Sequence, residues 1–211
     1  MLCGDRGLAN LDLCGDCIAS LPWDCEYRWS CMHTESGTDQ GPCPCILEEQ
    51  ASLSAVHSLF RYEGVIPQLL QRIKFGRDPV PCRTLGSLWA MAVGHRPKPD
   101  VLIPVPLHTL RQAWRGFNQS QLLAAALGRA LGVAVDPLAV RRTRATHAQS
   151  RLDREARQTN LSGAFGYDHL PAGRQIVIID DVYTTGATTR AVSDLLEYQS
   201  HRVSVWTLAR A

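Results

Sequence analysis

The segment IVIIDDVYTTGAT, residues 176–188, constrains the fold of this chain more than any other stretch. Its β-branched run from Ile176 to Ile179 predicts a buried strand, and two carboxylates, Asp180 and Asp181, stand at the carboxyl end of that run. A threonine-rich turn then leads into a predicted helix. Such a strand, turn and helix are typical of a parallel α/β sheet, in which ligands bind beyond the carboxyl ends of the strands.

The turn after this strand has the composition of a phosphate-binding loop. Backbone N–H groups at a helix N-terminus, threonine hydroxyls and the positive end of the helix dipole favour a phosphate monoester. Gly186 allows a close approach of the backbone or a positive φ. The acid pair repels the same phosphate, so we expect it to face a ribose or a hydrated metal ion. Together these features predict a ribose 5-phosphate ligand, and the alternative is an ordinary βα connection without a ligand.

Strands and helices alternate along the chain after residue 50. Asn118 is the expected N-cap of one helix and Gly132 its C-terminal stop. This alternation predicts a parallel sheet covered by helices on both faces. We expect strands at 56–62, 100–105, 174–181 and 202–208, and helices at 65–75, 84–93, 118–131 and 188–198.

Charge and cysteine content divide the chain near residue 50. Residues 1–50 hold nine acidic and two basic residues, whereas residues 51–211 hold 20 basic and 11 acidic residues. Seven of the eight cysteines lie in residues 1–50, and a cytoplasmic cysteine cluster is more often a metal site than a disulfide framework. No apolar run approaches the roughly 20 residues of a membrane-spanning helix, and the first residues do not resemble a secretory signal. We expect a cytoplasmic protein without membrane insertion, with a cysteine-rich element at 1–50 and an α/β domain at 51–211.

Two further segments are rich in arginine. Arg111 and Arg115 are spaced to share one face of a helix, where they can meet a diphosphate or form a solvated helix face. Residues 141–160 hold six arginines and few apolar positions. This composition predicts a mobile basic loop, either a lid over an anionic substrate or a solvated arm.

Three motifs together resemble the ComF family. Residues 176–188 match the phosphoribosyl-pyrophosphate (PRPP) signature of type I phosphoribosyltransferases, and RGFNQS at 115–120 and QSRLDREARQTN at 149–160 resemble family motifs. The resemblance runs from Cys3 to Ala209. It implies a type I phosphoribosyltransferase-like parallel sheet flanked by helices, behind a small N-terminal zinc-ribbon-like element. It also implies a role in DNA uptake, natural competence or the use of external DNA.

The resemblance assigns roles to individual residues. Asp180 and Asp181 are the implied catalytic carboxylates, and Mg²⁺ is implied as the companion of PRPP. The implied activity is phosphoribosyl transfer, a pentosyl glycosyltransferase reaction, to an acceptor that the sequence does not identify. The implied mobile loop contains Gln149, Arg151 and Arg157. The implied PRPP contacts are Thr184, Thr185, Gly186, Ala187, Thr188, Val105, Arg111 and Arg115.

The cysteine element matches the family's double zinc ribbon in part. Cys14 and Cys17 form its single CxxC pair, the spacing that lets two thiolates share a tetrahedral ion. Cys3 stands where the second member of an earlier pair is expected, which predicts that the true start codon lies upstream of Met1. One structural Zn²⁺, two Zn²⁺ and a metal-free remnant are the alternatives. The candidate ligands are Cys3, Cys14, Cys17, Cys25, Cys31, Cys43 and Cys45.

A second interpretation is a non-catalytic adaptor that binds single-stranded DNA or a competence helicase. Trp114, Phe117 and the arginines of residues 141–157 would then contact a strand through stacking and phosphate charge. Alanine at the acid pair should abolish an enzymatic function. If the protein is an adaptor, charge reversal at Arg142, Arg144 and Arg151 should matter more, because it would lower the affinity for a DNA strand.

Overall fold

The computed structural model describes residues 2–8, 11–24, 56–75, 78–94, 97–107, 116–143, 164–168 and 170–211. Its strands are β1 (Val56–Arg61), β2 (Val101–Pro104), β3 (Ala134–Val135), β4 (Val140–Arg142), β5 (Phe165–Tyr167), β6 (Gln175–Tyr183) and β7 (Arg202–Arg210). Its helices are α1 (Gly15–Ala19), α4 (Ile66–Phe75), α5 (Pro79–Val93), α7 (Gln119–Leu131) and α9 (Ala187–Tyr198). No helix in these ranges is long and apolar enough to cross a membrane.

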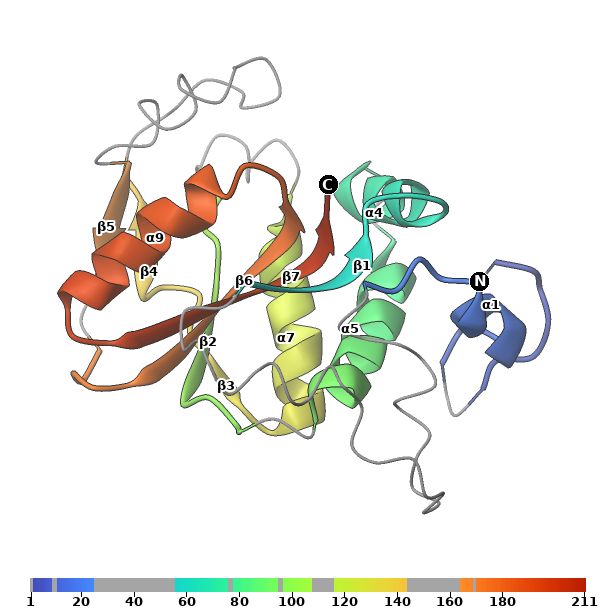
Figure 1. Ribbon diagram of the computed structural model, residues 1–211, viewed down its shortest axis with the longest axis horizontal. Helices are drawn as coiled ribbons and strands as arrows, with labels where there is room; N and C mark the ends of the chain where they lie inside the picture. The colour runs from blue at the N-terminus through green and yellow to red at the C-terminus, as the bar shows by residue number, and fades with distance from the viewer. Residues whose placement is uncertain are drawn as a thin grey trace.

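A parallel sheet forms the centre of the α/β domain (Figure 1). Its strand order is β1-β7-β6-β2-β3, and every pairing in it is parallel. The central strand β6 therefore pairs with β7 on one side and β2 on the other. This confirms the predicted parallel α/β fold. It also places the acid pair near the carboxyl end of the central strand.

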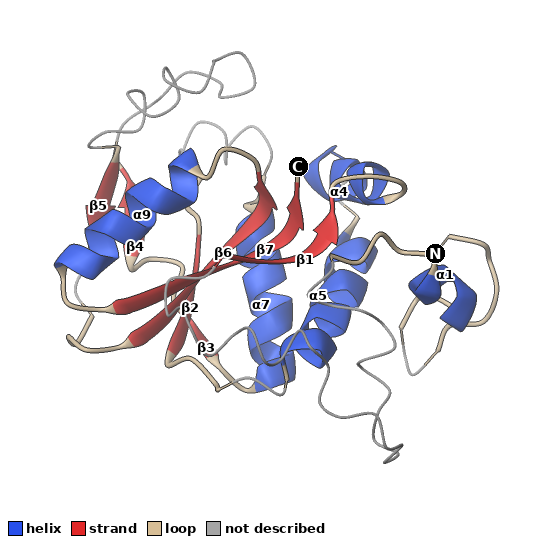
Figure 2. Ribbon diagram, in the orientation of Figure 1, coloured by secondary structure: helices blue, strands red, loops and turns tan. Residues whose placement is uncertain are grey.

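The two faces of β6 pack against different helices. Ile176 and Ile178 share a core with α9, whereas Val177 and Ile179 share a core with α4, α5 and α7. Alternation of side chains along a strand produces this division. In Figure 2, α9 lies at the left end of the molecule and α4 and α5 lie toward the right, where α1 lies beyond them. Each fully buried Leu or Ile in these cores contributes roughly 1.5–3 kcal/mol through removal of its apolar surface from water.

The ends of α7 form as the sequence predicts. The Asn118 side chain accepts a hydrogen bond from the Ser120 N–H at 3.0 Å. Gly132 ends the helix with a φ of 66°, and its N–H donates to the Gly128 carbonyl. These local signals fix the start of α7, which carries two residues of the site described below.

One helix differs from its predicted bounds by more than two residues. The sequence predicts a helix at 84–93, but α5 begins at Pro79. The Asp78 side chain accepts a hydrogen bond from the Val80 N–H at 3.0 Å, and proline is favoured in the first helical turn. The helix therefore begins at an Asp-Pro signal that the prediction missed.

The short N-terminal segment packs onto the α/β domain. Leu13 and Ile18 lie in the same core as α4 and α5. The rings of Trp23 and Phe60 of β1 pack at a tilt of 52°, with their centroids 4.8 Å apart. The division into elements at residue 50 stays a prediction, because residues 25–55 lie outside the described ranges.

Candidate ligand site at the carboxyl ends of the strands

A cavity of about 300 Å³ opens where β2 and β6 end. The loop from β6 to α9 forms one wall, and the residues after β2 form another. Lys74 of α4, Gln119 of α7 and Arg142 of β4 complete the lining. The full lining is Lys74, Val105, Pro106, Leu107, Gln119, Arg142 and residues 180–189.

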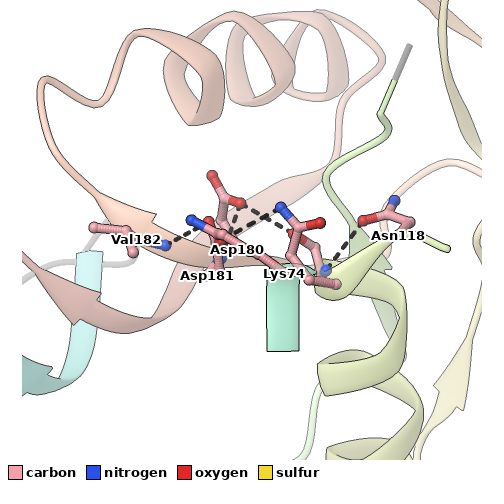
Figure 3. Close-up of polar contacts among 7 residues, drawn as sticks. Lys74, Asn118, Asp180, Asp181 and Val182 are labelled. Carbon is pink, nitrogen blue, oxygen red and sulfur yellow. Dashed lines mark hydrogen bonds and ion pairs between the residues drawn. The ribbon is translucent and has the colours of Figure 1, made fainter. Parts of the chain in front are cut away.

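The acid pair lines this cavity and is held by hydrogen bonds and an ion pair. Asp180 Oδ1 accepts from Ser120 Oγ at 3.1 Å and from the Asp181 N–H at 2.9 Å. Asp181 Oδ2 pairs with Lys74 Nζ at 2.7 Å and accepts from Gln119 Nε2 at 3.3 Å. Figure 3 shows the two carboxylates between α4, α7 and the end of β6.

The pKa of Asp180 is raised to about 7. Burial is the largest cause and the neighbouring Asp181 charge the second, while hydrogen bonds from the Asp181 N–H and Ser120 and the charge of Lys74 act in the opposite direction. Asp180 therefore changes between its neutral and charged forms near neutral pH. Such a carboxyl can accept a hydroxyl hydrogen bond when charged and donate one when neutral.

The threonine-rich loop depends on Gly186. This residue has a φ of 71° and precedes the first residue of α9. A Cβ at this position would lie 2.2 Å from Tyr183 Oη, so only glycine fits the turn without a shift. Gly186 has no side chain that could cap α9, and the backbone N–H groups of a first helical turn can bind an anion.

The wall after β2 is fixed by hydrogen bonds at Val105. The Val105 N–H donates to the Ile179 carbonyl at 2.9 Å, and Asn118 Nδ2 donates to the Val105 carbonyl at 3.0 Å. Pro104 and Pro106 flank this residue and restrict the backbone further. Val105 lies at the cavity, as its predicted role requires.

Three charged or polar lining residues from outside the β6–α9 segment were absent from the predicted site. Lys74 is the last basic residue of α4, and the sequence does not reveal that it meets a strand far along the chain. Gln119 belongs to the RGFNQS motif, whose resemblance to the family does not by itself give this residue a role. Arg142 lies at the base of the β4–β5 hairpin, with its guanidinium 5.5 Å from the centre of the Phe165 ring.

The remaining predicted site residues fall into two groups. Thr184, Thr185, Gly186, Ala187 and Thr188 line the cavity together with the acid pair. Arg111, Arg115, Gln149, Arg151, Arg157, Cys25, Cys31, Cys43 and Cys45 lie outside the described residues.

A second candidate site lies in the N-terminal segment. The Sγ atoms of Cys3, Cys14 and Cys17 all lie within 4.8 Å of one another, and those of Cys3 and Cys14 are 3.4 Å apart. The Cys17 N–H donates to Cys14 Sγ and lowers the pKa of the Cys14 thiol. Three thiols at this spacing could hold a metal ion. Cys82 lies apart from them in the core, where burial raises the pKa of its thiol to about 12.

The parallel sheet, the acid pair at the end of β6 and the threonine-glycine loop define a phosphoribosyltransferase-like protein. No family model matches the chain. DNA utilization protein YhgH of Escherichia coli K12 is 35% identical over 176 residues, which cover 80% of this chain and 78% of that protein. Competence protein F of Haemophilus influenzae is 33% identical to this chain over an alignment of 226 residues. The alignment covers 99% of this chain and 94% of competence protein F. The chain belongs to the ComF family, which contains these competence and DNA-utilization proteins.

One further relative and two solved structures are also similar to the chain. Competence protein ComFC of Streptococcus pneumoniae is 30% identical, over 88% of this chain and 81% of its own length. Among solved structures, adenine phosphoribosyltransferase from Saccharomyces cerevisiae has a TM-score of 0.40 and 19% identity, and covers 64% of this chain and 72% of its own. UMP synthase of Leishmania donovani has a TM-score of 0.42 and 19% identity, over 67% of this chain and 24% of its own.

Proposed function

We propose that this protein binds PRPP and transfers its phosphoribosyl group to an acceptor. The observation that carries the proposal is one cavity of about 300 Å³ that combines an acid pair with a threonine-glycine loop at a helix N-terminus. The loop suits a phosphate and the acid pair suits hydroxyls. A ribose 5-phosphate presents both groups on one small molecule.

The 5-phosphate would bind the backbone N–H groups and hydroxyls of residues 184–188. The ribose hydroxyls would then face the acid pair, and the pyrophosphate, with its Mg²⁺, would extend toward Val105 and the residues after it. Arg111 and Arg115 would neutralise the pyrophosphate. Their proposed role rests on the sequence, because they lie outside the described residues.

In the proposed reaction a nucleophilic atom of the acceptor attacks the anomeric carbon of PRPP. The bond from that carbon to the pyrophosphate oxygen breaks, and pyrophosphate leaves with the electron pair. The transition state resembles an oxocarbenium ion, so the residues of the site act by positioning the ribose and neutralising the leaving group. Gln149, Arg151 and Arg157 would close over the bound substrate and exclude water.

The names of the relatives support a role in natural competence or the use of external DNA. A strand-binding adaptor is the competing function, with single-stranded DNA or a competence helicase as its partner. The described part of the basic surface gives it limited support: Phe117 packs partly against the core, and Arg141 pairs with Asp168 at 2.6 Å. We therefore favour the phosphoribosyl function.

We further propose that the thiols of Cys3, Cys14 and Cys17 hold a structural Zn²⁺. Zn–S bonds of about 2.3 Å give a tetrahedral S–S edge of about 3.8 Å, and the described thiols are compatible with that spacing. A fourth ligand would come from the cysteines at 25–45. The ion would cross-link a segment too short to form a core of its own.

Calorimetric titration of PRPP with Mg²⁺ tests the main proposal. We expect micromolar affinity for the zinc-loaded wild-type protein and a loss of at least about 100-fold in an Asp180→Ala, Asp181→Ala variant, because charged hydrogen bonds to hydroxyls disappear. Asp194→Asn, at an exposed position of α9, is the matched control and should bind normally. Absence of binding to folded wild-type protein, with oligonucleotide binding that survives in the double variant, would establish the adaptor instead.

A further inference from the structure

We propose that the two carboxylates of the acid pair have different tasks. Asp180 contacts the ribose hydroxyls directly, and Asp181 is a support that Lys74 holds in place. Lys74 is thus a positioning residue, which acts on the ligand through Asp181. This inference rests on the proposed PRPP function and specifies which side chains carry it.

The alternation of β6 directs the two carboxylates to opposite faces of the sheet. Ile176 and Ile178 pack beneath α9, and Asp180 continues that series. Val177 and Ile179 pack beneath α4, α5 and α7, and Asp181 continues theirs. Asp180 therefore leaves the strand on the α9 face, although its Oδ1 also reaches Ser120 at the start of α7, whereas Asp181 meets Lys74 of α4 and Gln119 of α7.

The hydrogen bonds of the pair show the same asymmetry. Asp181 uses both oxygens within the protein: Oδ1 accepts from the Val182 N–H at 2.8 Å, and Oδ2 meets Lys74 and Gln119. Asp180 has both of its partners on Oδ1, and no hydrogen bond to its Oδ2 is found among the described residues. Asp181 is only 7% exposed, whereas Asp180 is partly exposed at the cavity. A hydroxyl can therefore reach Oδ2 of Asp180 without displacing a protein donor.

Lys74 is placed for its task by the amphipathic helix that carries it. Leu70 and Ile73 of α4 are each 1% exposed and fix the last turn against the core. The Lys74 side chain is 23% exposed, so its ion pair with Asp181 at 2.7 Å is shielded from much of the solvent. Without this cation the charges of two adjacent carboxylates at the end of β6 lose a neighbouring positive charge. Their repulsion would displace Asp181, and with it Asp180, whose Oδ1 accepts from the Asp181 N–H.

A double-mutant cycle on ligand affinity tests this division of tasks. The probes are ribose 5-phosphate and inorganic phosphate, titrated into wild-type protein and into Lys74→Met, Asp180→Asn and Asp181→Asn, singly and in pairs. Thermal unfolding of each variant confirms that it is folded. Lys98→Met is the matched control, because Lys98 is exposed near the amino end of β2, away from the cavity.

We expect Asp180→Asn to weaken ribose 5-phosphate binding by about 10- to 100-fold and phosphate binding by less than about twofold. Lys74→Met should weaken ribose 5-phosphate binding by about 5- to 10-fold, as the loss of a partly shielded charged contact would. It should have little further effect in Asp181→Asn, and a reduced effect in Asp180→Asn, because the ribose contact that Lys74 supports is already weakened there. Lys74→Arg should restore affinity to within about threefold of wild type, because it keeps the cation.

Two results would overturn the inference alone. One is additivity of Lys74→Met with Asp181→Asn, and the other is an equal loss of inorganic phosphate affinity in Lys74→Met, which would put Lys74 on the phosphate itself. A folded wild-type protein that binds neither PRPP nor ribose 5-phosphate would overturn the proposed function and this inference together.

Discussion

The threonine-glycine loop and the cysteine cluster are both short turns that lead into helices, but they are stabilised in different ways. The loop continues from β6, the central strand, which pairs with β7 from Gln175 to Tyr183 and with β2 from Ile176 to Ile179. The cysteine cluster joins Cys3 to the start of α1, a helix of five residues with one buried side chain, Ile18. The comparison shows that a ligand site can take its rigidity from a sheet, whereas the cluster needs a cross-link or contacts with the domain.

The N-terminal segment that carries the cysteine cluster contacts the sheet at the end of β7. Arg210 lies opposite Tyr183 of β6 in the sheet and pairs with Asp24, with Nε to Oδ2 at 2.6 Å and Nη2 to Oδ1 at 2.7 Å. Tyr183 in turn packs against Gly186. The ion pair thus links the N-terminal segment to β7, which pairs with β6 next to the loop. The variants below test whether the threonine-glycine loop and the cysteine cluster are energetically independent.

The largest effect is expected at Gly186. Gly186→Ala requires a side chain at a φ of 71° and a Cβ within 2.2 Å of Tyr183 Oη, so it should cost about 3 kcal/mol of unfolding free energy. Distortion of the loop should also lower PRPP affinity by at least about 100-fold. Gly173→Ala is the control, because Gly173 has a φ of 77° but no atom within 4 Å of the added Cβ. Equal PRPP affinities in the two variants would show that the loop does not hold the phosphate.

Arg210→Met should have the next largest effect. Asp24 is 1% exposed, so loss of the Arg210 cation removes a charged partner from a buried carboxylate. We expect a loss of about 3 kcal/mol in urea unfolding, with PRPP affinity changed less than about threefold. Arg61→Met, which breaks a pair with Glu63 in which both side chains are more than half exposed, should cost at most about 0.5 kcal/mol. Equal losses in these two variants would contradict a structural role for the Asp24 pair.

Metal removal should have a moderate effect that is confined to the cysteine cluster. Cys14→Ser should abolish bound zinc, measured by mass spectrometry of the metal, and lower Tm by about 6 °C through loss of a cross-link. PRPP affinity should stay within about threefold of wild type, because the cavity is built by the sheet. Cys82→Ala should keep its zinc, since Cys82 lies in the core. A loss of PRPP binding in Cys14→Ser would show that the two regions are coupled.

The smallest effect concerns pH. Because the pKa of Asp180 is raised from 3.8 to about 7 in the folded protein, the folded state binds this proton more tightly than the unfolded state. The group contributes stability that is fully present below about pH 4 and is lost as pH rises through about 7. Between pH 5 and pH 8 wild type should therefore lose more stability than Asp180→Asn, by on the order of 1 kcal/mol in urea unfolding. The same slope in both proteins would contradict the raised pKa.

Local sequence signals predicted most of the α/β domain. The β-branched run before Asp180 specifies a buried strand, and the Asn118 cap and the Gly132 stop specify the ends of α7. Each signal acts within a few residues of chain, where backbone and side-chain preferences decide the outcome. The start of α5 was also signalled locally, by Asp78 and Pro79, but the prediction overlooked it.

Other features depend on residues that are far apart in the chain. The β4–β5 hairpin joins two strands of three residues each, which are too short to show a periodic pattern. The ion pair between Asp24 and Arg210 likewise has no local sequence signal, because two charged residues far apart in the chain produce no periodic pattern in either segment. Both features appear only when the sheet brings the segments together.

The sequence by itself determined the parallel α/β fold, the composition of the loop at 184–188 and the presence of two carboxylates beside it. Backbone preferences and side-chain alternation act over short stretches, so these features could be predicted without a structure. Only the tertiary structure decided that Lys74 and Gln119 meet Asp181 while Asp180 keeps an oxygen toward the cavity. The physical reason is that packing of α4 and α7 on one face of β6 fixes which carboxylate receives these partners.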